Sequence, residues 1–243
     1  MSESSDHFSH IFYPFLHEES SLPENLWKEL RYSLTVKACE SMEVKEKFFA
    51  ANQDNVLRAS LALAQAYHRG RKMLVCGNGG SATDAQHVAV EFMHPITVGR
   101  VALPAICLNN DNALMTAVAN DVSFDDVFAR QIIALGQEED VFLAISTSGN
   151  SENLIQAFAT AQERRLTTIG FSGGDGGTMA RLHDEGLLDL CLTVPTPSVH
   201  RIQETHMALY HIIWDMTHEF LQHPALLSEP SAVADGLVVA GAE

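Results

Sequence analysis

Positive charge is scarce in this sequence. Its 243 residues include 15 Lys and Arg against 31 Asp and Glu, which gives a formal net charge of −16 at pH 7. Basic residues cluster only in the short run RGRK at 69–72. Proteins that bind nucleic acid or an anionic membrane surface usually present a basic face. We therefore expect no nucleic acid and no membrane among the partners of this protein.

Long apolar runs and secretion signals are missing as well. No apolar run approaches the length of about 20 residues that a membrane-spanning helix needs. The first residues, MSESSDHFSHIFYPFLHEES, are polar and acidic and lack a basic segment followed by an apolar one, so we expect no signal peptide. The four cysteines are scattered, at Cys39, Cys76, Cys107 and Cys191. Three of them lie in apolar strand-like runs, which predicts buried, reduced thiols in a cytoplasmic protein.

Short apolar runs alternate with helical patterns over most of the chain. After a polar segment at 1–22, residues 23–69 show helical spacing, and Gly70 is a suitable stop. Further helices are expected at 82–94, 123–135, 151–164 and 199–221. Apolar runs predict five strands, at 72–77, 103–108, 140–146, 166–172 and 188–194. Runs that are apolar nearly throughout suit strands covered on both faces, so the pattern predicts an α/β, three-layer fold with a five-stranded parallel sheet and N-terminal helices.

Glycine and hydroxyl residues gather where the predicted strands end. The segments GNGGSA (77–82), NNDN (109–112), STSGNS (146–151) and SGGDGG (172–177) follow the first four strands. Ligands of open α/β sheets bind beyond the carboxyl ends of the strands. The hydroxyls of STSGNS stand before a helix whose N-terminus attracts anions, which favours a phosphate site. The alternative is that Ser151 only caps this helix.

Two kinds of nucleotide site are disfavoured by missing residues. No Lys follows Gly149, so the Walker pattern is absent and hydrolysis of a nucleoside triphosphate is disfavoured. Gly77, Gly79 and Ala82 fit a dinucleotide fingerprint, but the acidic residue expected about 20 residues further on is missing. This loop suits instead a backbone that closely approaches a small polar ligand.

Two predicted helices each combine an imidazole with an oxygen-bearing side chain. His87 and Glu91 are four residues apart, hence about 40° apart around the helix axis. Gln203 and His211 are eight residues apart, about 80° around the axis, with His206 between them. Two nitrogen and two oxygen ligands suit zinc, and manganese or iron also accepts them. The alternative is a surface pair on one helix and hydrogen-bonded core histidines on the other.

Four segments of the chain resemble, in order, the sugar isomerase (SIS) domain family, and most closely its bacterial phosphoheptose isomerases. They are CGNGGSATDAQHVAVE, AVANDVSFDDVFARQ, LAISTSGNSENLIQAF and RIQETHMALYHII. The resemblance covers 45–222 and leaves out an N-terminal tail and helical extension (1–44) and a C-terminal tail (223–243). It implies a flavodoxin-like sheet and a homotetramer with active sites at subunit interfaces. The implied reaction converts sedoheptulose 7-phosphate to D-glycero-D-manno-heptose 7-phosphate through an enediolate, the first step of activated heptose biosynthesis.

The resemblance also implies a role for particular residues. One Zn²⁺ per subunit would be held by His87, Glu91, Gln203 and His211. Glu91 is expected to act as the base at carbon and His211 as the partner acid/base. An arginine that the family often has after the metal helix has only Arg100 as a counterpart here. The implied substrate contacts are Asn78, Gly79, Gly80, Glu91, Asn120, Asp121, Ser146, Thr147, Ser148, Ser151 and Gln203.

Two alternatives stay open at this point. Either Glu91 binds the metal through one oxygen and works as a base with the other, or the metal is structural, because a metal-bound carboxylate is a weak base. The second alternative concerns function. A similar SIS-domain protein is a non-catalytic regulator that binds the bacterial replication initiator protein. From the resemblance, that relative lacks the equivalents of Glu91 and His211, and their presence here favours the isomerase.

Overall fold

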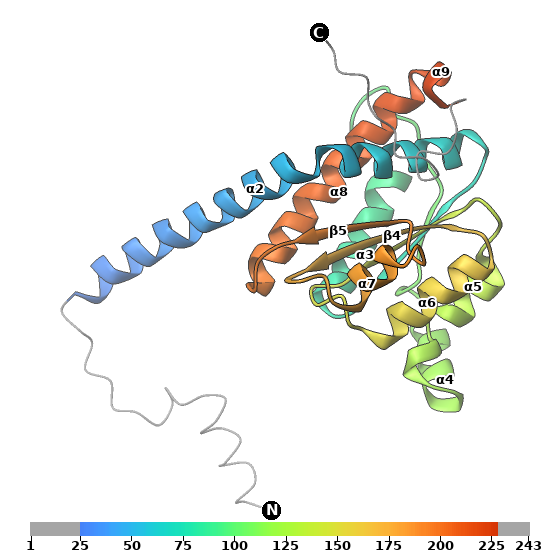
Figure 1. Ribbon diagram of the computed structural model, residues 1–243, viewed down its shortest axis with the longest axis horizontal. Coiled ribbons are helices and arrows are strands. Elements are labelled where there is room, and N and C mark those ends of the chain that lie inside the picture. Colours follow the sequence, from blue (N-terminus) through green and yellow to red (C-terminus); the bar gives the residue numbers. More distant parts are fainter. Residues whose placement is uncertain (1–24, 228–243) are drawn as a thin grey trace, which may run out of the picture. The chain divides into compact units, whose positions relative to one another are not determined.

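The computed structural model describes residues 25–227 of the chain (Figure 1). The chain divides into two units, Met1–Glu40 and Ser41–Glu243. The described part of the first unit is the beginning of helix α2, which runs over Leu26–His68. Asn52 has non-helical dihedral angles (φ −124°, ψ 18°) and its amide donates to the carbonyl of Phe48 at 2.9 Å, so α2 is kinked there. The tail predicted at 1–22 lies outside the described residues.

Five parallel strands form one sheet in the order β2-β1-β3-β4-β5, which confirms the predicted fold class. This is the flavodoxin-like order, in which the chain direction across the sheet reverses between β1 and β3. The carboxyl ends of these two strands therefore flank the place where such sheets bind ligands. The strands are β1 (Met73–Gly77), β2 (Ala105–Cys107), β3 (Val141–Ile145), β4 (Thr167–Gly173) and β5 (Leu190–Val194).

Alternate residues of each central strand enter two separate hydrophobic cores, because successive side chains point to opposite faces of a sheet. In β1, Met73 and Val75 belong to one core, and Leu74 and Cys76 to the other. The first core is closed by the second half of α2, by α3 (Gly80–Met93) and by α8 (Val199–Leu221). Helices α5 (Ala129–Leu135) and α6 (Glu152–Glu163) close the second (Figure 1). The molecule therefore has the three layers that the sequence predicts.

The helix expected at 123–135 differs from the structure. In its place are a 3₁₀ turn, η2 (Phe124–Asp126), and the short helix α5. Before them lies α4 (Asn112–Asp121), a helix that the pattern did not predict. Val118 is the only buried residue of α4, so this short helix contributes little to the core. Two further short helices, α7 (Gly177–Asp184) and α9 (Pro224–Leu227), were also not predicted.

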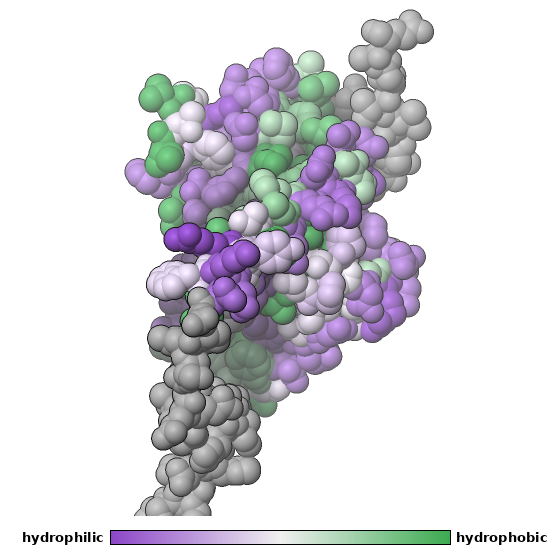
Figure 2. Space-filling view, turned by 90° about the vertical axis from the view of Figure 1, so that its left-hand side faces the viewer, coloured by the Kyte–Doolittle hydropathy of each residue, from purple (hydrophilic) through white to green (hydrophobic). Residues whose placement is uncertain are grey.

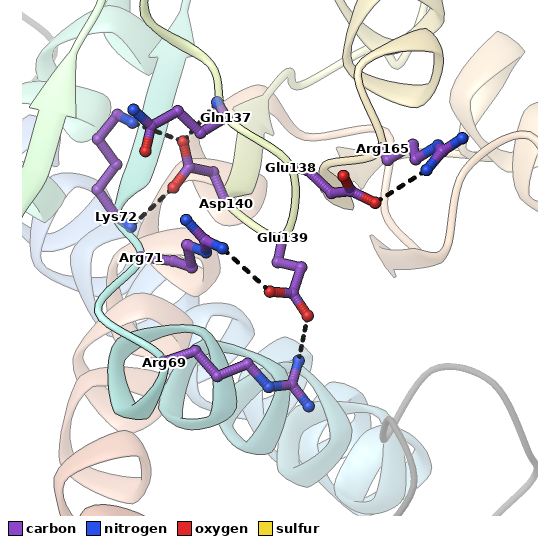
Figure 3. A network of polar contacts seen from close by, with 8 residues as sticks. All are labelled: Arg69, Arg71, Lys72, Gln137, Glu138, Glu139, Asp140 and Arg165. Atoms are coloured by element: carbon purple, nitrogen blue, oxygen red, sulfur yellow. Dashed lines mark hydrogen bonds and ion pairs between the residues drawn. The ribbon is translucent and has the colours of Figure 1, made fainter.

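The basic run at 69–72 is neutralised by acidic residues at the amino end of the sheet (Figure 3). Asp140 is fully buried, and its carboxylate accepts from Lys72 Nζ at 2.6 Å and from the backbone N–H of Gln137 at 2.8 Å. Glu139 lies 3.3 Å from Arg69 and from Arg71. These contacts join the segments that precede β1 and β3. The basic residues of the run therefore have a structural role at the amino ends of these strands.

Among the described helices, none is both long and apolar enough to cross a membrane. Figure 2 shows the side of the molecule on which α8 begins, and hydrophilic and hydrophobic residues are interspersed over it. No hydrophobic surface covers this side continuously.

Candidate active site

The loop after β1 is fixed by two asparagine side chains from other loops and helices. Asn109, beyond the end of β2, accepts from the N–H of Gly77 at 3.1 Å and donates to its carbonyl at 2.8 Å, as a neighbouring strand would. Asn78 and Asn153 exchange two amide hydrogen bonds, of 2.9 and 3.0 Å. Asn153 is 2% exposed and lies in the first turn of α6, directly after the loop 146–151. The loops after β1 and β3 are therefore joined where the strand order reverses.

The loop 146–151 is also folded onto a glycine turn. The hydroxyl of Ser146 accepts from the N–H of Gly149 at 3.0 Å. A side-chain carbon at Gly149 would lie 2.0 Å from the carbonyl oxygen of Gly176, so only glycine fits this close approach. Ser151 makes no side-chain cap to α6, so the alternative that it only caps this helix finds no support. Ser148 is exposed, and the loop presents hydroxyls at a helix N-terminus without a cationic side chain of its own.

His87, Glu91 and His211 form a cluster whose potential metal-ligand atoms all lie within 4.8 Å of one another. His87 and Glu91 come from α3, and His211 comes from the facing helix α8. His87 Nε2 lies 3.1 Å from Glu91 Oε1, and the rings of His87 and His211 are 5.1 Å apart. The side chains of His87 and Glu91 are 40% and 22% exposed, so a solute can reach them. Burial lowers the pKa of His211, which keeps its imidazole neutral around neutral pH.

Gln203 lies against the glycine at the start of α3. A side-chain carbon at Gly80 would come within 2.1 Å of Gln203 Nε2, so the amide of Gln203 packs directly on this backbone. Gln203 and His211 are eight residues apart on α8, about 12 Å along the helix axis. Gln203 therefore connects the loop after β1 with the helix that carries His211. The imidazoles of His87 and His211 and the carboxylate of Glu91 are donors that zinc accepts.

Two buried side chains of α8 support the cluster from behind. The hydroxyl of Tyr210 lies 2.8 Å from His87 Nδ1, and Trp214 Nε1 donates to the carbonyl of Glu91 at 2.8 Å. Burial, and then the charges of Asp84 and Glu91, raise the pKa of Tyr210. Its hydroxyl therefore stays protonated. Sequence reasoning missed Tyr210 and also Asn153, because helical spacing alone does not show which residue on another helix a side chain meets.

His206, which lies between Gln203 and His211 in the sequence, is not part of the cluster. It is fully buried on the other face of α8, and its Nε2 donates to the carbonyl of Ser172 at 3.0 Å. Burial lowers the pKa of His206 to about 4. This histidine is a neutral, hydrogen-bonded residue of the core.

For three further residues considered from the sequence, the structure shows contacts outside the cluster. Asn120 and Asp121, at the end of α4, are exposed, and the amide of Asn120 donates to Asp121 at 2.7 Å. In Figure 1, α4 lies at the lower end of the molecule, apart from α8. Arg100 pairs with two acidic residues of α8, Asp215 at 2.9 Å and Glu219. Its charge is therefore already matched, and no contact with substrate follows from its position.

The sequence of this chain is similar to those of known proteins that belong to one family. The SIS domain family profile matches residues 39–173. A phosphoheptose isomerase of Nitratidesulfovibrio vulgaris is 40% identical over 203 residues, which are 84% of this chain and 95% of the relative. One of Clostridium acetobutylicum is 43% identical over 183 residues, which are 74% and 91% of the two chains.

Two solved structures of phosphoheptose isomerases are similar to the structure of this chain. The phosphoheptose isomerase of Neisseria gonorrhoeae has a TM-score of 0.72 and 37% identity to this chain, and the match covers 78% of this chain and 99% of that one. The one of Francisella tularensis has a TM-score of 0.73 at 34% identity, over 77% and 97%. The chain therefore belongs to the SIS domain family and, within it, to the phosphoheptose isomerases.

Proposed function

We propose that this protein is an aldose–ketose isomerase that converts sedoheptulose 7-phosphate to D-glycero-D-manno-heptose 7-phosphate, the first step of activated heptose biosynthesis. The observation that carries the proposal is the cluster of Glu91, His87 and His211 beside two loops suited to a phosphosugar. Relatives that are 40% and 43% identical over most of their length are named phosphoheptose isomerases.

The reaction moves a proton between two neighbouring carbons. A base removes a proton from C1 of the ketose to give an enediolate, and returning the proton to C2 gives the aldose. Meanwhile a second group carries a proton from the C1 hydroxyl to the C2 oxygen. We assign the carbon base to Glu91 and the oxygen acid/base to His211, which face each other across α3 and α8.

The substrate would be held by the loops at the carboxyl ends of β1 and β3. Asn78, Gly79 and Gly80 are assigned to the sugar, and the hydroxyls of 146–151 to the phosphate. The amide of Asn78 is already paired with Asn153, so we expect Asn78 to contribute through its backbone. Glu91 and Gln203 are assigned to the reacting end of the sugar.

We assign His87, Glu91, Gln203 and His211 as ligands of one Zn²⁺ per subunit. Bound there, the ion would polarise the carbonyl and stabilise the negative charge of the enediolate. The reading in which the ion is structural keeps the same four ligands. Metal analysis of the purified protein should find about one zinc ion per chain, and substitution of His87 should remove it.

We also propose a cytoplasmic homotetramer whose active sites lie at subunit interfaces. Asn120 and Asp121 are exposed and apart from the cluster, so we assign their substrate contacts to a second copy of the chain. Val122 and Phe124, directly after them, are 55% and 53% exposed, as residues of an interface are in an isolated subunit. Cys76 and Cys107 are buried and free, as expected of a protein from a reducing compartment.

The decisive experiment is to incubate the purified protein with sedoheptulose 7-phosphate and to follow the reaction by NMR. New anomeric signals of an aldose 7-phosphate are expected, with exchange of hydrogen at C1 and C2 when the reaction runs in D₂O. Absence of turnover, together with tight binding to the replication initiator protein, would instead support the non-catalytic regulator.

A further inference from the structure

The hydroxyl of Tyr210 makes one polar contact with the candidate metal cluster. It lies 2.8 Å from Nδ1 of His87, although the two residues are 123 positions apart in the sequence. Tyr210 is 2% exposed, and its ring lines a small apolar cavity together with Val88, Phe92 and Ile213. An apolar ring would fill this position equally well. The hydroxyl needs a partner because burying an unpaired polar group costs free energy, and His87 provides one.

The two nitrogens of His87 face different surroundings. Nε2 lies 3.1 Å from Glu91 Oε1, inside the cluster, whereas Nδ1 lies against Tyr210. A neutral imidazole that offers the lone pair of Nε2 to an ion carries its proton on Nδ1. A tyrosine hydroxyl can accept that N–H and still donate its own proton onward. Asp84, less than one turn before His87 on α3, has a buried carboxylate oxygen that lacks a hydrogen-bond partner within the described part of the chain.

We propose that Tyr210 is a positioning residue of the metal cluster. It receives the N–H of His87 Nδ1 and thereby fixes both the tautomer and the direction of the ring, so that the lone pair of Nε2 points to Glu91 and His211. This inference rests on the proposed metal centre and extends it to a residue behind the ligands. Partners of this kind orient metal-bound histidines and tune their affinity for the ion.

The test compares two tyrosine variants in metal-stripped protein. Tyr67 is the matched control, since it is also buried, and its hydroxyl has no hydrogen-bond partner among residues 25–227. Zn²⁺ affinity is measured by competition with a chromogenic chelator. Tyr210→Phe should weaken zinc binding by roughly 10- to 100-fold, whereas Tyr67→Phe should leave it unchanged. Circular dichroism melting of both variants verifies that the fold is kept.

A second measurement needs no folded variant of Tyr210. In zinc-loaded wild-type protein labelled with ¹⁵N-histidine, long-range ¹H–¹⁵N spectra distinguish the two tautomers, and loss of signals in His87→Gln assigns those of His87. The proton should be on Nδ1 of His87. Wild-type protein that binds no zinc overturns the metal centre and the role of Tyr210 together. Zinc binding with equal affinity in Tyr210→Phe, or a His87 proton on Nε2, overturns the role of Tyr210 alone.

Discussion

The side-chain amides of Asn78 and Asn153 lie face to face and exchange two hydrogen bonds, of 2.9 and 3.0 Å. Asn78 belongs to the loop after β1, and Asn153 to the first turn of α6, which follows the loop 146–151. A side-chain amide can both donate and accept, so each of the two residues provides a donor and an acceptor for the other. It thus fixes the relative position of the two loops to which we assign the sugar and the phosphate.

Removing one member of this pair should weaken both the fold and the site. Asn153→Ala leaves the amide of Asn78 without its partner, and we expect a loss of about 2 kcal/mol in the free energy of unfolding, measured in urea. The KM for the phosphosugar should rise because the two loops are no longer held together. Gln156→Ala, on the exposed side of the same helix, is the control and should change the stability by less than about 0.5 kcal/mol. Equal stability of the two variants would show that the amide pair is unimportant.

Glu91 should be essential for turnover but not for folding. Glu91→Gln keeps the size and hydrogen-bonding capacity of the side chain and removes the base, so we expect kcat to fall by a factor on the order of 10² to 10⁴. The oligomeric state, measured by light scattering, should stay the same. Turnover at the wild-type rate would remove Glu91 from the mechanism.

Gly80 should matter through Gln203 rather than through the backbone. In Gly80→Ala the new methyl group would lie 2.1 Å from Gln203 Nε2, and the flexible amide has to turn away. We expect little loss of stability, because alanine is favoured over glycine in a helix by about 1 kcal/mol, but weaker zinc binding and slower turnover. In the double variant Gly80→Ala/Gln203→Ala, the zinc affinity should equal that of Gln203→Ala alone. An additional loss in the double variant would contradict this explanation.

His206 should make the fold sensitive to acid. Its pKa is lowered to about 4 in the folded protein from 6.5, so between these values the unfolded chain binds more protons. The stability that comes from keeping this histidine neutral is therefore complete above about pH 6.5 and decreases as the pH falls toward 4, by about 3 kcal/mol in total. His206→Gln keeps a donor for the Ser172 carbonyl and should flatten this dependence in urea unfolding curves. His94→Gln, at an exposed position, should keep the wild-type slope. A slope unchanged in His206→Gln would contradict the assignment.

The strands could be predicted because burial on both faces leaves a strong signal. Four of the five predicted apolar runs contain the whole observed strand, and β4 extends one residue beyond its run. For example, β1 was expected at 72–77 and spans Met73–Gly77. Helix α4 has one buried residue, and α7 has only eight residues and begins at a glycine, so neither gives a long periodic pattern. The spacing of His87 and Glu91 predicted one side of the cluster, and the family resemblance supplied the residues of α8. The partners Tyr210 and Asn153 depend on how helices face each other, which no local pattern contains.

The loop 146–151 leads to a prediction that does not depend on the family. Ser148 is exposed at a helix N-terminus, and the loop 146–151 has no Lys or Arg, so its affinity for an anion has to come from neutral donors. Each such donor contributes about 1.5–3 kcal/mol toward a charged acceptor. Ser148→Ala should therefore weaken binding of the phosphosugar by roughly ten- to a hundredfold. The affinity is measured by calorimetry in a Glu91→Gln background, in which turnover is impaired. Inorganic phosphate should compete for the site, and sedoheptulose without its phosphate should bind poorly. If sedoheptulose binds as tightly as its 7-phosphate, or if Ser148→Ala keeps the wild-type affinity, the phosphate lies elsewhere and this loop serves only as a turn between β3 and α6.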